Sequence, residues 1–342
     1  MKIGIYLNAQ HPETDDPRRK FDEMIEQVRF ARALGFDSLW GGEHHATPGY
    51  HYFPLLGTLQ RLAAEAEGMT IGTNIVLLPL HNPVEIAEQG AYLDVLSDGR
   101  FMLGVGLGYR QQEFDIFGVP LQQRVSRFVE SIEVIRRLWC EDHVTHNGRH
   151  WQFEDVTIRP RPMQASPPVL VGAQVEASIA RAAAIGDGWC MVPSATVGEI
   201  TQQIEMYLCA RRAAEKPGLG HLVRLFEVVC ARDPETALRR AAPHLLAKYV
   251  SYAQWGLEGV RFDSAESPEV QLKRLAANRF AVGAPSDIVD AFMIQHQLGV
   301  THVTMRVGWP GMPQASILES LELIGTTVLA EVRQRIAAAQ AS

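Results

Sequence analysis

The chain has 342 residues, 46% of them hydrophobic and 21% charged, which is enough to bury a large core in one α/β barrel or in two ordinary domains. Its formal net charge of −7 and the alternation of basic with acidic residues argue against a nucleic-acid partner. The longest uncharged stretch, 68–84, is interrupted by Asn, His and Pro, whereas a membrane span needs about 20 mostly apolar residues, so no membrane segment is expected.

The cysteines bear on the compartment. Cys140, Cys190, Cys209 and Cys230 lie far apart and form no CxxC pair, so they are expected to be buried free thiols in a reducing environment. The apolar stretch at 2–7 is too short for a signal peptide and is soon followed by His and Pro. We therefore expect a cytoplasmic globular protein.

Short apolar segments alternate along the chain with longer segments of helical period. The expected strands are 2–7, 36–42, 69–79, 100–108, 167–173, 187–192, 221–230 and 300–307. The expected helices are 21–35, 54–68, 84–99, 122–139, 175–186, 196–214, 284–297 and 314–336. Strands rich in Val, Ile and Leu that alternate with helices indicate a parallel sheet buried on both faces. Eight such units predict a single (β/α)8 TIM barrel over residues 1–342.

Two segments exceed a minimal barrel. Residues 141–168, before the fifth strand, are expected to form short extra strands, and residues 233–283, after the seventh, to hold extra helices and the polar stretch 257–270. Insertions of this length usually have a role, such as covering a pocket.

Chemistry in a β/α barrel lies at the C-terminal ends of the strands, and the second strand ends in Glu43-His44-His45. A shared metal ion is disfavoured, because adjacent residues of a strand point to opposite faces and the other strand ends offer few ligands. No catalytic metal is therefore expected. A histidine that is merely hydrogen-bonded in a loop and a histidine in acid–base chemistry both remain open.

Two glycine-containing segments also fall at strand ends. The GVGLGYRQQEF segment (104–114) resembles a dinucleotide fingerprint only superficially, because it does not follow the first strand. In the segment 171–189 a strand ends at Gly172-Ala173 and a helix starts near Val175, with Ser178 in its first turn and Arg181 beyond. Free amides at a helix N-terminus, a hydroxyl and a guanidinium suit a phosphate, although an ordinary capped helix has the same pattern.

Taken together, the chain resembles the bacterial luciferase-like monooxygenase family of flavin-dependent β/α barrels. The resemblance runs through nearly the whole chain and is sharpest in the first 190 residues. The motifs that carry it are GFDSLWGGEHH (35–45), the long segment 71–119, VSRFVESIEVIRRLW (125–139), PPVLVGAQVEASIARAAAIGDGW (167–189) and GWPGM (308–312).

The resemblance implies roles at the ends of the second, third and fourth strands. It places His44 beside the flavin as a catalytic residue, and a cis peptide between Asn74 and Ile75 beneath the ring. The end of the fourth strand, Gly106-Leu107-Gly108, would approach the cofactor. At the position of Leu107 the luciferases carry an arginine that contacts the FMN phosphate, so this chain departs from the family there, and Arg110 or Arg181 is a candidate replacement.

The resemblance also implies a phosphate loop after the fifth strand, at Gly172, Ala173, Gln174 and Val175, with Ser178 beyond. Luciferase has Glu-Ser where this chain has Gln174-Val175, so backbone amides are expected to bind the phosphate here.

The substrate is expected to lie beside the ring. Residues 48–54 and 233–283 are candidate covers that exclude water. The expected substrate residues are Glu43, His45, Tyr50, Tyr52 and Trp309, with Phe53 as a further aromatic of the same loop. Each of these aromatics is equally compatible with ordinary packing.

Three functions remain compatible with the resemblance. The first is a monooxygenase that uses reduced FMN and O2 on an apolar or carbonyl substrate, with a separate flavin reductase. The second is a deazaflavin-dependent oxidoreductase that exchanges hydride with an alcohol, sugar phosphate or enone, and the third is a non-catalytic flavin-binding protein. The sequence favours FMN, because a net charge of −7 gives no sign of a basic groove for an acidic deazaflavin tail. The resemblance also implies a homodimer through the helices at 84–96 and 127–139, whose apolar faces are equally compatible with packing on the barrel.

Overall fold

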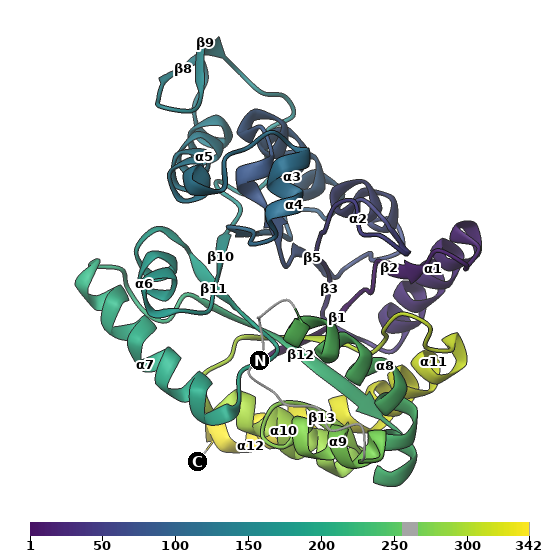
Figure 1. Ribbon diagram of the computed structural model, residues 1–342. Coiled ribbons are helices and arrows are strands. Elements are labelled where there is room, and N and C mark those ends of the chain that lie inside the picture. Colours follow the sequence, from purple (N-terminus) through teal and green to yellow (C-terminus); the bar gives the residue numbers. More distant parts are fainter. Residues whose placement is uncertain (255–265, 342) are drawn as a thin grey trace.

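The protein closes a parallel barrel around its core (Figure 1). This computed structural model describes residues 1–254 and 266–341. The barrel strands are β1 (Lys2–Tyr6), β3 (Ser38–Gly41), β5 (Thr70–Thr73), β7 (Phe101–Gly106), β10 (Val169–Ala173), β11 (Gly188–Met191), β12 (His221–Cys230) and β14 (His302–Arg306). Each strand is parallel to its neighbours, and the pairs β7–β10 and β1–β14 complete the ring. The predicted eight-stranded TIM barrel is therefore confirmed.

Helices surround this ring. They are α1 (Pro17–Ala33), α2 (Leu55–Leu62), α3 (Pro83–Leu96), α5 (Arg124–Cys140), α6 (Glu176–Ile185), α7 (Val197–Ala213), α10 (Pro285–Gln297), α11 (Gln314–Leu323) and α12 (Leu329–Ala341). The last two were predicted as one helix, and they are joined by a π-helical turn at Ile324–Val328. Several of these helices begin at residues that cap them. Before α1, the side chain of Asp16 accepts hydrogen bonds from the amides of Arg18 and Arg19, and the first helical residue is a proline.

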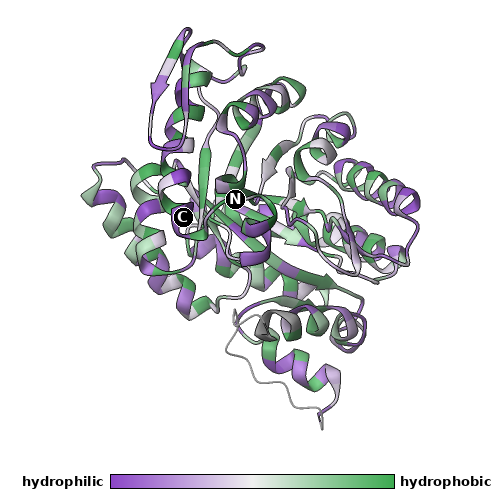
Figure 2. Cartoon of the chain, turned by 45° about the horizontal axis from the view of Figure 1, so that its top comes forward, coloured by the Kyte–Doolittle hydropathy of each residue, from purple (hydrophilic) through white to green (hydrophobic). Residues whose placement is uncertain are grey.

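Alternate residues of the strands fill the barrel interior. Tyr6, Trp40, Met102, Leu170, Cys190, Val223 and Leu225 form this inner cluster. Trp40 fits because Gly72 on the neighbouring strand has no side chain: a Cβ there would lie 2.2 Å from the indole. The central strands are accordingly mostly hydrophobic, whereas hydrophilic residues gather on the helices around them (Figure 2).

The first predicted insertion is confirmed as a hairpin, β8 (Val144–Asn147) with β9 (Gln152–Val156), which projects from the barrel (Figure 1). The second contains α8 (Pro234–Gln254), α9 (Pro268–Ala276) and β13 (Ala281–Gly283), which pairs with the end of β12. Most of the polar stretch 257–270 lies outside the described residues.

Smaller elements at the strand ends differ from the prediction. The predicted third strand divides into β5 and β6 (Val76–Leu77), followed by the 3-10 turn η1 (Leu78–Leu80). After β7 the chain forms an unexpected short helix, α4 (Gln111–Ile116), and the turn η2 (Leu121–Gln123) precedes α5. The loop at 48–54 contains β4 (Tyr50–Tyr52), which pairs with β2 (Gln10–Pro12).

The four cysteines are free, as expected, but only Cys190 and Cys230 are buried. The prediction that all four are buried is wrong, because Cys140 and Cys209 lie on exposed turns of α5 and α7. Among the described residues, every helix is too short or too polar to cross a bilayer.

Candidate active site

The EHH motif lies at the C-terminal end of the barrel, directly after β3. His44 and His45 point to different partners, as the alternation of an extended chain requires. Nδ1 of His44 lies 3.0 Å from Oε1 of Glu113, whereas Nε2 of His45 lies 3.7 Å from Oε1 of Glu43. The side chains of Glu43 and Glu113 are almost fully buried, and those of the two histidines are about one-quarter exposed.

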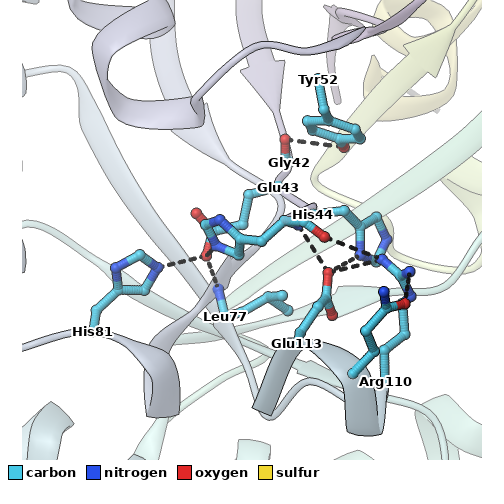
Figure 3. A network of polar contacts seen from close by, with 10 residues as sticks. Gly42, Glu43, His44, Tyr52, Leu77, His81, Arg110 and Glu113 are labelled. Carbon is cyan, nitrogen blue, oxygen red and sulfur yellow. Dashed lines mark hydrogen bonds and ion pairs between the residues drawn. The ribbon is translucent and has the colours of Figure 1, made fainter. Parts of the chain in front are cut away.

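Glu113 receives three donors on one oxygen. Besides His44, its Oε1 accepts the backbone N–H of His45 at 2.9 Å and Nη1 of Arg110 at 3.2 Å (Figure 3). Burial raises the pKa of Glu113, but the hydrogen bond and charge of His44, the His45 amide and the charge of Arg110 outweigh it, so this pKa is lowered. Sequence reasoning missed Glu113, because the short helix α4 that carries it was not predicted.

Glu43 accepts its hydrogen bonds from the segment that follows β5 (Figure 3). Its Oε1 accepts the backbone N–H of Leu77 and Nε2 of His81, the latter at 2.8 Å. Burial raises the pKa of Glu43, yet its contacts with His45 and His81 lower it to about 2. Burial lowers the pKa of His81, but Glu43 raises it more, and the net change is upward. His81 was also missed, although it follows a strand-end segment that the family resemblance had already marked.

A cavity of about 550 Å³ opens onto this cluster. Its walls include His44 together with four of the five expected substrate residues, Glu43, His45, Tyr50 and Tyr52. The described residues that line it include the carboxylates of Glu43 and Glu85 but no lysine or arginine. The ring of Tyr52 lies edge-on to that of His44, with centroids 5.9 Å apart. The cavity is therefore part apolar and free of basic side chains other than histidine.

Two of the expected substrate aromatics pack elsewhere. Trp309 is 2% exposed and is absent from the walls of this cavity; its indole N–H donates to Oε2 of Glu227 at 3.1 Å. Phe53 packs edge-on against Phe21 and His11. The prediction that Trp309 and Phe53 line the substrate cavity is not supported, because both rings contact other residues of the protein instead.

The ends of β5, β7 and β10 meet at Ile75. The peptide bond between Asn74 and Ile75 is cis, as the resemblance implied. A Cβ at Gly106 would lie 1.9 Å from Cδ1 of Ile75, and one at Gly172 would lie 3.4 Å from the same atom. The two glycines therefore let the Ile75 side chain lie across three strand ends.

Gly108, two residues after Gly106, lies in the turn that leads from β7 to α4. Gly108 has φ +73°, and a Cβ there would lie 3.0 Å from Phe114 on α4. Glycine is needed here because other residues rarely adopt this conformation.

The loop after β10 caps α6. The hydroxyl of Ser178 accepts the amides of Gln174 and Val175 at 3.2 and 3.1 Å and donates to the carbonyl of Val175. The amides of Gln174 and Val175, which were predicted to bind phosphate directly, are thus already paired. The first helical amides after Val175 remain as the usual donors of a helix N-terminus, one turn before Arg181.

Arg110 does not lie with this loop. Besides Glu113, it donates to the carbonyl of His45 at 3.5 Å and to Gln112 at 3.3 Å, so the structure places it beside EHH. Of the two arginines suggested for the phosphate, Arg181 is the one on the helix that follows the loop.

Comparison with known proteins gives the same fold and a family. The family model described as luciferase-like monooxygenase matches residues 1–302. The solved structure of the monooxygenase RslO1 from Streptomyces bottropensis is similar, with a TM-score of 0.83 and 26% identity over 96% of this chain and 99% of that one.

Two curated relatives differ in their named cofactor chemistry. The oxygenase component of flavin-dependent trigonelline monooxygenase from Acinetobacter baylyi is 30% identical over 183 residues, 51% of this chain. The chain spans about half the length of that relative, 49%. The F420-dependent glucose-6-phosphate dehydrogenase of Segniliparus rotundus is 26% identical over 94% of this chain and 96% of its own length.

Proposed function

Because the chain belongs to the luciferase-like monooxygenase family, we propose that it is the oxygenase component of a flavin-dependent monooxygenase. It would use reduced FMN and O2 on a small apolar or carbonyl substrate. Similarity along the whole chain to a monooxygenase structure supports this proposal.

The observation that carries the proposal is the His44–Glu113 pair beside the cavity. Oε1 of Glu113 already accepts N–H groups of His45 and Arg110, so it is the acceptor toward His44 as well, and Nδ1 of His44 carries the proton. Nε2 of a neutral His44 then holds a lone pair and can take up a proton and return it. Glu113 fixes the ring orientation, which makes Glu113 a positioning residue and His44 the proton-transferring group.

The strand ends suit a flavin. Bound reduced FMN would supply the electrons for oxygen activation. Gly106, Leu107, Gly108 and the Asn74–Ile75 segment offer an apolar surface for the ring, and Nδ2 of Asn74 is a buried donor that no described residue satisfies. The phosphate would be held after β10, beside Gly172 to Val175 and the capping residue Ser178, by the free N-terminal amides of α6 and by Arg181.

The cavity suits a neutral organic substrate. Glu43, His45, Tyr50 and Tyr52 would contact it, and β4 and the loop around it would exclude water. Deazaflavin-dependent hydride transfer is the second candidate, supported by the nearly full-length similarity to a glucose-6-phosphate dehydrogenase. Against a sugar phosphate as substrate, the described walls contain no lysine or arginine to pair with its charge.

The same proposal includes its partners. A separate reductase would supply reduced flavin, as the words "oxygenase component" in a relative's name suggest. A homodimer would form through α3 and α5, whose exposed faces carry Tyr92, Val95, Val125 and Val129. We place the protein in the cytoplasm, because its cysteines are free.

The first experiment titrates the purified protein anaerobically with reduced FMN and with deazaflavin, then admits air. Tighter binding of reduced FMN, followed by a transient absorbance that depends on oxygen, is the expected result. Tighter binding of deazaflavin, without a reaction with oxygen, would indicate that the protein catalyses hydride transfer instead. Binding without either chemistry on any substrate would indicate a flavin-binding protein.

Two variants test the residue roles once turnover is measured. His44→Ala should abolish most turnover, and an unchanged rate would refute the role of His44. Glu113→Gln keeps a carbonyl oxygen for the three donors but removes the negative charge that stabilises a protonated His44, so it should slow turnover and change its pH profile while flavin still binds. A Glu113→Gln enzyme with the wild-type pH profile would reduce Glu113 to a structural residue.

A further inference from the structure

Glu43, His45 and His81 converge on one point at the wall of the cavity. Oε1 of Glu43 lies 2.8 Å from Nε2 of His81 and 3.7 Å from Nε2 of His45, and one ligand atom from each residue lies within 4.8 Å of the others. This set differs from the His44–His45 pair that the sequence disfavoured as a metal site, because Glu43 and His45 are two residues apart and lie on the same side of the chain. His81 comes from a different part of the barrel rim.

We propose that Glu43, His45 and His81 form a binding site for a divalent transition-metal ion of the Zn²⁺ class. Two imidazoles and one carboxylate are a donor set that Zn²⁺ accepts, with bonds of about 2.0–2.2 Å. Tetrahedral geometry with such bonds separates ligand atoms by about 3.3 Å. The two separations from Oε1 of Glu43, 2.8 and 3.7 Å, lie on either side of that value, and the three ligand atoms all lie within 4.8 Å of one another.

A second observation points to the same place. Nε2 of His45 is buried and has no hydrogen-bond partner among the described residues. A buried nitrogen without a partner carries a desolvation cost, and a bound ion is one of the explanations that such an atom requires. Nε2 is also the atom by which His81 faces Glu43, so both histidines direct the same nitrogen at the carboxylate.

The site would keep one coordination position open. All three residues line the cavity of about 550 Å³, so a fourth ligand, water or a substrate heteroatom, can reach the ion from that side. The ion would also be linked to the acid–base pair, because the backbone N–H of His45 donates to the oxygen of Glu113 that holds His44. Metal binding would therefore modulate the geometry at His44 without replacing it.

The test uses untagged, flavin-free protein that has been treated with a chelator, so its result does not depend on the proposed oxygen chemistry. Titration calorimetry with Zn²⁺ should give one saturable site, and Mg²⁺, which prefers oxygen ligands, should give none. His45→Gln and His81→Gln should each weaken Zn²⁺ binding at least about tenfold, since even outer partners of metal ligands are worth that much. His51→Gln is the control, because His51 binds the carbonyl of Asp15 outside this cluster.

Two results would overturn the site: no saturable Zn²⁺ binding, or either ligand variant binding as tightly as the wild type. Should a variant fail to fold, Co²⁺ added to the wild-type protein replaces that measurement. A strong visible absorbance of four-coordinate Co²⁺ supports the site, and the weak absorbance of six-coordinate Co²⁺ refutes it.

Discussion

Replacing His302 should remove part of the protein's sensitivity to mild acid. His302 lies on β14 at the end of the barrel opposite the cavity, with its ring 5.7 Å from that of His221 and 6.1 Å from that of Trp40. Burial, followed by the charge of His221, lowers the pKa of His302 from 6.5 to about 4. In the folded protein the imidazole is therefore neutral at pH 5, whereas in the unfolded chain it is mostly protonated.

The magnitude follows from proton linkage. Between pH 6.5 and 4 the unfolded chain binds a proton that the folded protein does not, so unfolding becomes easier as the pH falls. For these pKa values the neutral, buried state of His302 contributes about 3 kcal/mol to the free energy of unfolding, and about 2 kcal/mol of it is lost between pH 7 and pH 5. Well above pH 6.5 the imidazole is neutral in both the folded and the unfolded state, so the free energy of unfolding no longer depends on the ionisation of His302.

Urea unfolding of the wild type and of His302→Gln at pH 7 and pH 5 measures this difference. The wild type should lose about 2 kcal/mol more on acidification than the variant, whatever the variant's stability at pH 7. His221→Gln, which removes the second cause of the lowered pKa, should reduce the pH dependence in part. An equal loss in wild type and His302→Gln would refute the reasoning.

Two further predictions concern the strand ends and the interior. Gly106→Ala should weaken binding of reduced FMN and destabilise the fold by about 1–3 kcal/mol, because its Cβ would displace Ile75; flavin titration and urea unfolding measure both effects. Trp309→Phe should cost about 1–3 kcal/mol in urea unfolding, because it leaves the buried carboxylate of Glu227 without one donor, while flavin binding stays unchanged.

These two predictions have their own controls. Gly57→Ala adds a methyl group where no atom lies within 4 Å, so it should leave flavin binding unchanged and keep or raise stability. Flavin binding by Gly106→Ala at the wild-type affinity would mean that Ile75 does not support the ring. A Trp309→Phe protein as stable as the wild type would mean that Glu227 does not need this hydrogen bond.

The sequence by itself determined the barrel. Eight apolar segments separated by helical ones specify a parallel sheet with both faces buried, and this pattern is local, so each element could be placed within a few residues. The order of elements also placed EHH and the loop after β10 at strand ends, because all carboxyl ends of a parallel barrel lie on one side. Family motifs added the cis peptide at Asn74–Ile75, which the structure has.

Only the tertiary structure decided which side chains meet. Glu113 reaches His44 across 69 residues of chain and His81 reaches Glu43 across 38, and no local pattern encodes such pairs. The direction of a side chain at a strand end is set by what packs around it. For that reason the sequence named Trp309 as a cavity residue, although its indole donates to the buried Glu227. It also suggested Arg110 for the phosphate, although Arg110 lies beside His45. Periodicity fixes the elements of this protein, and long-range packing fixes the chemistry at their ends.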